Sequence, residues 1–424
     1  MATQTPDTTG LADSDFARDA RQAATLGDVV RDYRDRLRGG DMGALPAVAG
    51  LVVLFAVFTF SSGDFLTVRN MANLIVQAGA ICVLAMGLVL VLLLGEIDLA
   101  AGYTGGTSAA VAALAIVDHG QPWYIAVVAA LATGGVIGLL IGGLNSYLGI
   151  PSFVVSLAFF LALQGVLLKL IGDGGSVPVQ DDVLRGLAIK NVPTLWGWIG
   201  AIVIVVVYAA LSANRYRVQT ARDLQRPPIA LVALRIVGLA VLLLGLVGMM
   251  NQNRAANVNL PALQGLPWTV PVVGFLLILW TFVLDRTAFG RFLYAVGGNP
   301  EAARRAGINV QRIKVLAFVF AGMMAAIAGI LQASFTGSVY PGSGGGNTLL
   351  YAVGAAVIGG TSLFGGKGKA RDAVIGGVVI ATIANGLGLL ANASYINYLV
   401  TGGVLLLAAS VDAITRRRRS AAGV

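Results

Sequence analysis

The chain has 424 residues, of which 57% are hydrophobic and 12% charged, and its mean hydropathy is +0.82. A globule of this length would leave much of that apolar surface in water, so the composition excludes a soluble protein and indicates one embedded in a membrane. The net charge of +9 comes from basic residues gathered in a few loops and at the tails, which suits a membrane protein better than one that binds nucleic acid.

Cysteine and histidine counts exclude further classes of site. Cys82, the single cysteine, lies inside an apolar run, which leaves no disulfide and no spacing typical of a metal site. His119, the single histidine, falls in a predicted loop, which argues against histidine-based catalysis. We therefore expect no catalytic residue, no metal and no cofactor bound by this chain.

The two ends of the chain are polar. Residues 1–44 are rich in Arg and Asp and lack the apolar core of a cleavable signal, which predicts a cytosolic tail. Within this tail, the segment from Asp28 to Arg38 is either a short surface helix or disordered. Residues 414–424 carry four arginines and form a second basic tail.

Between the tails, residues 45–413 read as an all-α transmembrane bundle. Because a helix rises about 1.5 Å per residue, roughly 20 residues cross a hydrocarbon core of about 30 Å. Twelve apolar segments are candidates: Leu45–Phe60, Leu74–Leu94, Tyr103–Val117, Trp123–Asn145, Ser152–Ile171, Leu195–Ala213, Ile229–Met250, Trp268–Leu284, Val315–Phe335, Thr348–Leu363, Ala373–Ala391 and Ile396–Ala413. Tyr103–Val117 and the glycine-rich Thr348–Leu363 are short for full crossings, and re-entrant segments there would lower the count toward ten.

The basic residues test this count. With all twelve segments crossing and the amino terminus in the cytosol, 23 of the 29 Lys and Arg residues fall in cytosolic segments. An even number of spans with both termini cytosolic is therefore expected. The same arrangement places the longest polar interval of the second half, Asp285–Lys314, in the cytosol.

A short, well-capped helix is predicted inside that interval. Asn299 is a good N-cap, Pro300 suits the first helical position, Glu301 meets the positive helix end, and Gly307 can close the helix. A helix of about two turns between two membrane segments cannot bury a core of its own. We therefore expect this helix to dock onto another protein.

The composition of the helix favours docking. Arg304 and Arg305 lie in the last turn, where positive charge is favourable, and Glu301 with Arg305 forms an i,i+4 pair. Ala302 and Ala303 are expected to leave a flat face for the other protein.

Two carboxylates follow the second predicted span. Glu96 and Asp98 end an apolar run, and carboxylates near a membrane segment are costly unless they reach water or a partner. They are candidates for a substrate pathway, or they simply lie in interfacial water. General acid–base chemistry has little support, since no nucleophile lies nearby.

Uncharged polar residues are thinly scattered through the spans. Gln77, Asn145, Gln164 and Asn385 suit a path for a neutral polyol better than a path for an ion, and hydrogen bonding between helices explains them equally well. Spacings such as Gly134 to Gly138 predict tight helix packing. Gly359–Gly368 does not match a phosphate-binding P-loop, because Gly366 intervenes before the lysine.

Three motifs together resemble a known family. They are Gly95-Glu96-Ile97-Asp98-Leu99, the run from Gly297 to Asn309, and the run from Ile358 to Gly366. In this order they resemble the monosaccharide permeases of ABC-type importers, of the ribose and xylose type. The longer xylose-type members are the closer match, because ribose-type members lack the added apolar material around Leu195–Met250. Ala100 and the run Lys369–Ala373 depart from the family pattern.

The resemblance implies a multi-pass permease subunit in the plasma (inner) membrane of a bacterium, importing xylose or a similar pentose or hexose. It also implies an ABC ATPase subunit that binds ATP and Mg, an extracytoplasmic sugar-binding protein and a second permease copy in a homodimer. The ATPase-coupling residues would be Asn299, Pro300, Glu301, Ala302, Ala303, Arg304, Arg305 and Gly307. On this interpretation, a bulky charged residue in place of Ala303 uncouples transport from ATP hydrolysis and leaves membrane insertion intact.

Two other classes remain open. An ion-coupled secondary sugar transporter would need coupling residues near mid-membrane, usually with an internal repeat, and no clear repeat is found. A membrane enzyme or scaffold would act without partners.

Overall fold

The computed structural model describes residues 44–222, 227–255 and 262–390, with a few single residues further out. The predicted tails lie almost entirely outside the described residues, and so does the larger part of the predicted last span, Ile396–Ala413.

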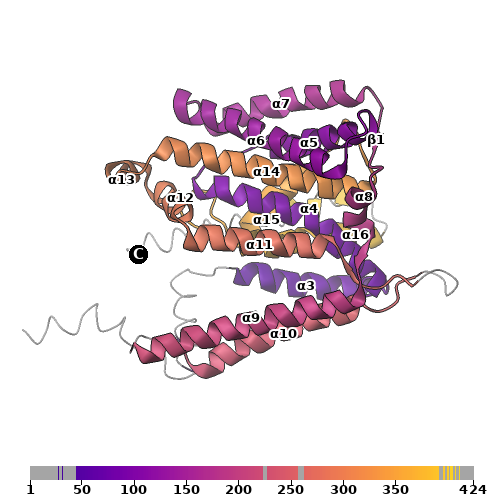
Figure 1. The fold of residues 1–424 in the computed structure, drawn as a ribbon, viewed down its shortest axis with the longest axis vertical. Coiled ribbons are helices and arrows are strands. Elements are labelled where there is room, and N and C mark those ends of the chain that lie inside the picture. Colours follow the sequence, from indigo (N-terminus) through magenta and orange to yellow (C-terminus); the bar gives the residue numbers. More distant parts are fainter. Residues whose placement is uncertain are drawn as a thin grey trace, which may run out of the picture. The chain divides into compact units, whose positions relative to one another are not determined.

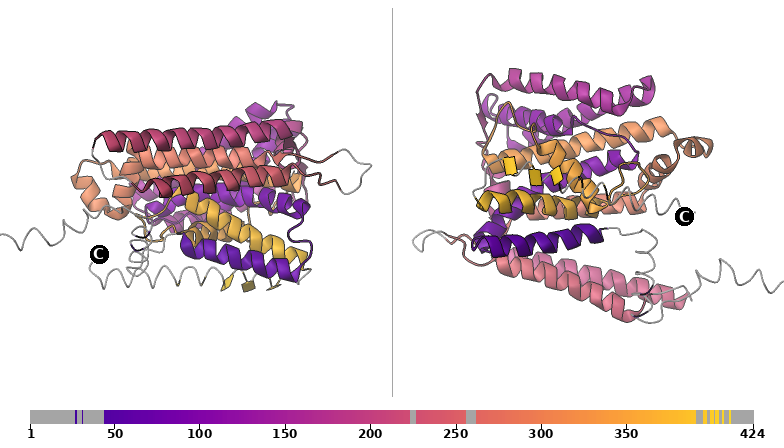
Figure 2. Two further views of the ribbon diagram at one scale, coloured as in Figure 1. Left: turned by 90° about the horizontal axis from the view of Figure 1, so that it is seen from below. Right: turned by 180° about the vertical axis from the view of Figure 1, so that it is seen from behind.

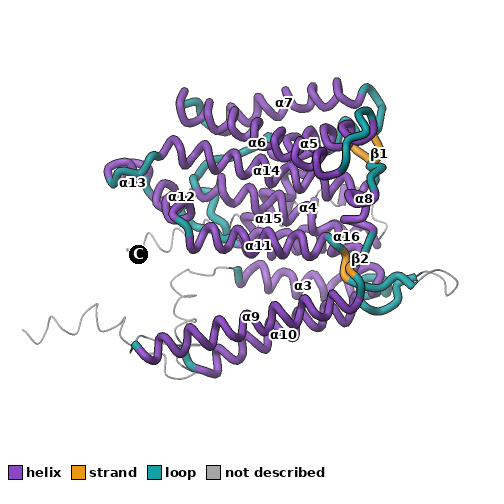
Figure 3. Tube along the Cα trace, in the orientation of Figure 1, coloured by secondary structure: helices purple, strands orange, loops and turns teal. Residues whose placement is uncertain are grey.

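Helices dominate the described part of the chain, with four two-residue strands in the loops (Figures 1 and 3). The helices are α3 (Leu45–Ser61), α4 (Val68–Leu93), α5 (Ala101–Val117), α6 (Trp123–Leu148), α7 (Ser152–Ile171), α8 (Asp182–Ile189), α9 (Thr194–Ala221), α10 (Ile229–Met250), α11 (Thr269–Arg286), α12 (Ala288–Gly298), α13 (Pro300–Arg305), α14 (Val310–Thr336), α15 (Thr348–Gly359) and α16 (Ala370–Leu389). The strands are β1 (Val177–Pro178), β2 (Asn191–Val192), β3 (Leu266–Pro267) and β4 (Ser338–Val339). They pair antiparallel as β1 with β4 and β2 with β3.

The helices fall where the apolar runs predicted spans. Among the described residues, eight helices are long and apolar enough to cross a membrane: α4, α6, α7, α9, α10, α11, α14 and α16. The apolar helices α3, α5 and α15 are shorter. With 17 and 12 residues, α5 and α15 are about 26 and 18 Å long, less than a hydrocarbon core. The helical membrane bundle is thus confirmed, and the count of twelve spans stays a prediction.

The helices form two compact units. One contains α9 and α10, which pack as an antiparallel pair. Gly197 lies near Val247, and Gly248 lies against the Trp198 ring, so small residues allow this contact. The second unit contains the other helices.

Helix α4 is the centre of the second unit. Of its most apolar stretch, 83% is buried, because α14, α15, α16 and α11 all pack against it. Helix α14 also packs along α5 and α6, and α3 runs beside α16 in both views of Figure 2. In this unit α12 and α13 lie at one end and α8 and β1 at the opposite end (Figure 1).

Glycines bring α6 and α14 into backbone contact. A Cβ added at Gly134 would lie 2.2 Å from the carbonyl oxygen of Gly322, and one added at Gly138 would lie 2.2 Å from that of Phe318. Both distances are far below van der Waals contact. The tight packing predicted from the spacing of Gly134 and Gly138 is confirmed.

We predict that Gly138→Ala destabilises the protein, because the new methyl group meets the α14 backbone, which cannot rotate away. The expected cost is about 1–3 kcal/mol, as for other overpacked cores. Gly143→Ala, also in α6, is the matched control, since nothing lies within 4 Å of its added Cβ. Thermal unfolding in detergent should show a lower midpoint for the first variant and no loss for the second; equal midpoints would contradict the packing.

Candidate functional site

The three sequence motifs meet at the end of the second unit that carries α12 and α13. A Cβ added at Gly297 would lie 1.8 Å from the carbonyl oxygen of Leu93, so the end of α12 touches the end of α4. The amide of Gly366 donates to the same Leu93 oxygen at 2.8 Å. A Cβ added at Gly95 would lie 3.3 Å from the carbonyl oxygen of Phe364. We call residues 94–100, which join α4 to α5, the α4–α5 turn.

The sequence explains how α4 stops here. Gly95 has φ +74°, a conformation that glycine adopts without strain, and its amide donates to Leu92 at 2.9 Å. The amide of Glu96 reaches back to Val91 at 3.2 Å. The last carbonyls of a helix lack partners within the helix, and the Gly366 amide satisfies that of Leu93.

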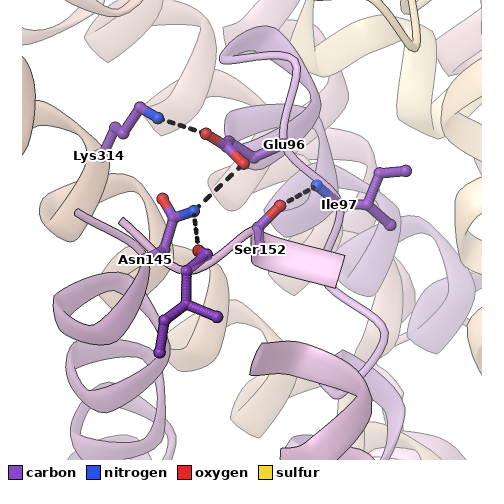
Figure 4. Close-up of polar contacts among 6 residues, drawn as sticks. Glu96, Ile97, Asn145, Ser152 and Lys314 are labelled. Carbon is purple, nitrogen blue, oxygen red and sulfur yellow. Dashed lines mark hydrogen bonds and ion pairs between the residues drawn. The ribbon is translucent and has the colours of Figure 1, made fainter. Parts of the chain in front are cut away.

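Glu96 lies in a polar cluster on this turn (Figure 4). Its carboxylate forms an ion pair with Lys314 of α14, and the two side chains are only 16% and 21% exposed. Asn145, near the end of α6, donates to the other carboxylate oxygen at 3.5 Å and to the carbonyl of Ile150 at 3.0 Å. Glu96 therefore has a charged partner. The alternative that its carboxylate simply lies in interfacial water is wrong.

The next residue ties the turn to α7. The Ile97 amide donates to the Ser152 hydroxyl at 3.2 Å, and the Ser156 hydroxyl donates to the Ile97 carbonyl at 3.3 Å. Both serines are buried. Lys314, Ser152 and Ser156 are site residues that the sequence did not indicate, because their partners lie far away in the chain.

Asp98 is buried at the start of α5. It is 4% exposed, and its carboxylate accepts a hydrogen bond from the Ala100 amide at 2.9 Å. Burial raises the pKa of Asp98 to about 6, although the amides of Ala100 and Ala101 act in the opposite direction. Asp98 is therefore also withdrawn from water.

The helix predicted at residue 300 is present as α13. Asn299 caps it by accepting from the amides of Glu301 and Ala302, each at 3.0 Å, and Gly307 has φ +82°. Glu301 pairs with Arg304 at 2.9 Å. The pair predicted with Arg305 is wrong, because one turn of this short helix brings residue i+3 into reach.

One side of α13 is covered by the chain itself. Ala303 is 4% exposed, whereas Ala302, Arg304 and Arg305 are exposed. The prediction that both alanines form an open face is therefore wrong for Ala303, which packs inward. The outward face consists of Ala302, the two arginines and Ala306.

Helix α12 is fixed by a further contact that the sequence did not indicate. The Tyr294 hydroxyl donates to the carbonyl of Gly368 at 2.7 Å. Burial, with the nearby carboxylates of Asp285 and Asp372, raises the pKa of Tyr294 to about 12, so the phenol keeps its proton at neutral pH.

The six residues expected along a substrate pathway do not form one path. Glu96, Asp98 and Asn145 lie at the α4–α5 turn. Asn385 instead exchanges hydrogen bonds with Asn70 at 2.9 and 3.0 Å, which joins α16 to α4. Gln164 is exposed on α7, and Gln77 is partly buried on α4. Hydrogen bonding between helices accounts for Asn385.

A small cavity lies elsewhere in the second unit. It has a volume of about 40 Å³ and lies between α4, α5, α14 and the loop before α15. Its lining includes Gly102, Gly106, Gly329, Gln332 and Ser343, and none of the six expected residues. It holds little more than a water molecule.

We predict that Asp98 makes the free energy of unfolding depend on pH. The pKa of Asp98 is higher in the folded protein than the usual 3.8. The stabilisation that its protonated form gives the folded state is therefore fully present below about pH 4 and is lost as the pH rises through 6. Asp98→Asn keeps an oxygen for the Ala100 amide and should remove this dependence. Between pH 5 and pH 8, thermal unfolding should show the free energy of unfolding of the wild type falling by about 1.4 kcal/mol relative to the variant, since about one pH unit separates pH 5 from the pKa of Asp98; parallel curves would contradict the assignment.

Comparisons with known proteins agree on one family. Residues 70–409 match the family described as branched-chain amino acid transport system / permease component. The chain is 36% identical to the xylose transport system permease protein of Escherichia coli (strain K12), over 88% of this chain and 92% of that protein. It is 34% identical to the xylose transport system permease protein of Haemophilus influenzae, over 88% and 96% of the two chains.

A ribose import permease protein, from Escherichia coli (strain K12), is 30% identical over 86% of this chain and 92% of its own length. No solved structure matches the chain. With its apolar helices, the chain is a multi-pass protein of the inner membrane. It belongs to the family of transport system permease components that its residues 70–409 match.

Proposed function

We propose that this chain is the membrane-spanning permease subunit of an ATP-driven importer of a monosaccharide, with xylose or a similar pentose or hexose as cargo. The observation that carries the proposal is the capped helix α13 at the meeting point of the three motifs. Similarity to xylose and ribose permeases over most of the chain supports it, and the greater identity to the xylose permeases favours xylose over ribose.

The proposed assembly contains the partners that such a permease needs. An ABC ATPase binds ATP and Mg and docks on the outward face of α13. A sugar-binding protein delivers the cargo at the opposite end, and a second permease copy completes a homodimer. Both termini lie in the cytosol, and twelve spans cross the membrane, as the distribution of basic residues suggests.

The surroundings of α13 suit the transfer of a movement. Before it, α12 is fixed by Tyr294 on Gly368 and by Gly297 on Leu93. After it, Val310 opens the long helix α14, which packs along α4, α5 and α6. A push on α13 therefore reaches the central helices as a rigid-body displacement.

Transport assays in vesicles test this function. Proteoliposomes with the permease, the ATPase inside and the sugar-binding protein outside should take up labelled xylose only with internal ATP. Vanadate should stop uptake, and ionophores that collapse ion gradients should not. Uptake driven by an ion gradient without the ATPase would instead identify a secondary transporter, and competition by ribose or allose would define the sugar.

We predict that Ala302→Arg prevents productive contact with the ATPase, because it places a large charged side chain on the outward face of α13. ATPase recovered with the permease should fall about tenfold or more while the permease still unfolds at the wild-type temperature.

Two further variants make the result specific. Ala221→Arg, an exposed alanine at the end of α9, is the matched control and should leave recovery unchanged. Ala303→Arg should lower the unfolding temperature, since Ala303 is buried. Normal ATPase binding by Ala302→Arg would contradict the docking face.

A further inference from the structure

The segments before and after α13 both contact the region where α4 ends and the α4–α5 turn begins. Before α13, Gly297 touches Leu93 at the end of α4. After α13, Lys314 of α14 pairs with Glu96. Helix α13 is thus flanked by two contacts with this part of the chain, one at the last residue of α4 and one at the α4–α5 turn, although Lys314 lies 218 residues beyond Glu96.

The same turn holds helices on its other side. Ile97 donates through its amide to Ser152 of α7, and Asn145 of α6 donates to Glu96 (Figure 4). The carbonyl of Ile97 accepts from Ser156, also of α7. Two adjacent residues, Glu96 and Ile97, therefore connect α14 with α6 and α7. Helix α7 also packs against α5 and α6, and the α4–α5 turn fixes its first turn through Ser152 and Ser156.

Among these contacts, the ion pair between Glu96 and Lys314 is best suited to transmit a movement. It is largely shielded from water, so its attraction is less weakened than that of an exposed pair. The Glu301–Arg304 and Lys190–Asp182 pairs have side chains that are at least half exposed. Shielding also makes it costly to separate Glu96 from Lys314, because each charge would lose its partner.

We propose that Glu96 is a positioning residue for transport: through its ion pair with Lys314, displacement of α13 and α14 moves the α4–α5 turn and, through Ile97, the first turn of α7. This inference rests on the proposed function. Glu96 does not contact the sugar in this role. It connects the docking helix, through α14 and the α4–α5 turn, to α6 and α7.

The test measures sugar uptake and ATP hydrolysis in the same proteoliposomes, with the permease, ATPase and sugar-binding protein together. Glu96→Gln and Lys314→Gln should keep ATP hydrolysis within about twofold of wild type and reduce the xylose taken up per ATP about tenfold. The exchange Glu96→Lys with Lys314→Glu should restore most of that ratio. Ser152→Ala, which leaves the ion pair intact, should lower the ratio to a smaller extent.

Arg217→Gln is the matched control, because it removes one exposed charge from α9, which belongs to the other unit, and should leave the ratio unchanged. Thermal unfolding accompanies each variant. A purely structural role would lower the unfolding temperature and reduce uptake and hydrolysis in proportion, and would overturn the inference. A wild-type ratio in both single variants, or no recovery in the exchange, would also overturn it.

The two proposals fail in different ways. If the wild-type vesicles show no ATP-dependent uptake, the proposed function is wrong whatever the variants do. If wild-type uptake depends on ATP and the variants keep its ratio, only the role of Glu96 is wrong.

Discussion

The carbonyl oxygen of Leu93 is the point on which this end of the molecule depends. It belongs to the last turn of the most buried helix, where no partner exists within the helix, and a buried carbonyl without a partner is costly. The Gly366 amide supplies the partner, and Gly297 allows α12 to approach because it has no side chain. At this one carbonyl, motifs that lie far apart in the chain come into contact. Helix α13 follows directly after α12, which is part of that contact.

Much of the fold follows from the sequence because a membrane imposes strict lengths and polarities. Helices α7 and α10 match the predicted segments at both ends, and α4 begins earlier than predicted because Thr67 caps it. Helix α9 runs on to Ala221, and α15 ends at Gly359. Helix α14 begins at Val310 rather than Val315, because Asn309 caps it through the Arg312 amide. The ends of α13 were predictable for the same reason: Asn299 and Gly307 act on their own neighbours in the chain.

The site was predictable only where its contacts are local. The partner of Glu96 could not be found from the sequence, because Lys314 lies 218 residues further on and only the packing of α14 on α4 brings the two together. The burial of Ala303 depends on how α13 folds back on its neighbours, which two adjacent alanines do not reveal. For Asn385 the sequence left a pathway and a contact between helices equally open, because its partner Asn70 lies in another helix. In each case the sequence shows the type of side chain, and only the fold shows which element it contacts.

The central claim is that α13 lies on the cytosolic side and is the helix on which the ATPase docks. The most direct measurement is the accessibility of Ala306→Cys, on the outward side of α13, in spheroplasts; Cys82 is buried and gives little background. The account predicts that a membrane-permeant maleimide labels this cysteine, that an impermeant one labels it only after the cells are opened, and that bound ATPase protects it. Labelling by the impermeant reagent in intact spheroplasts would contradict the account.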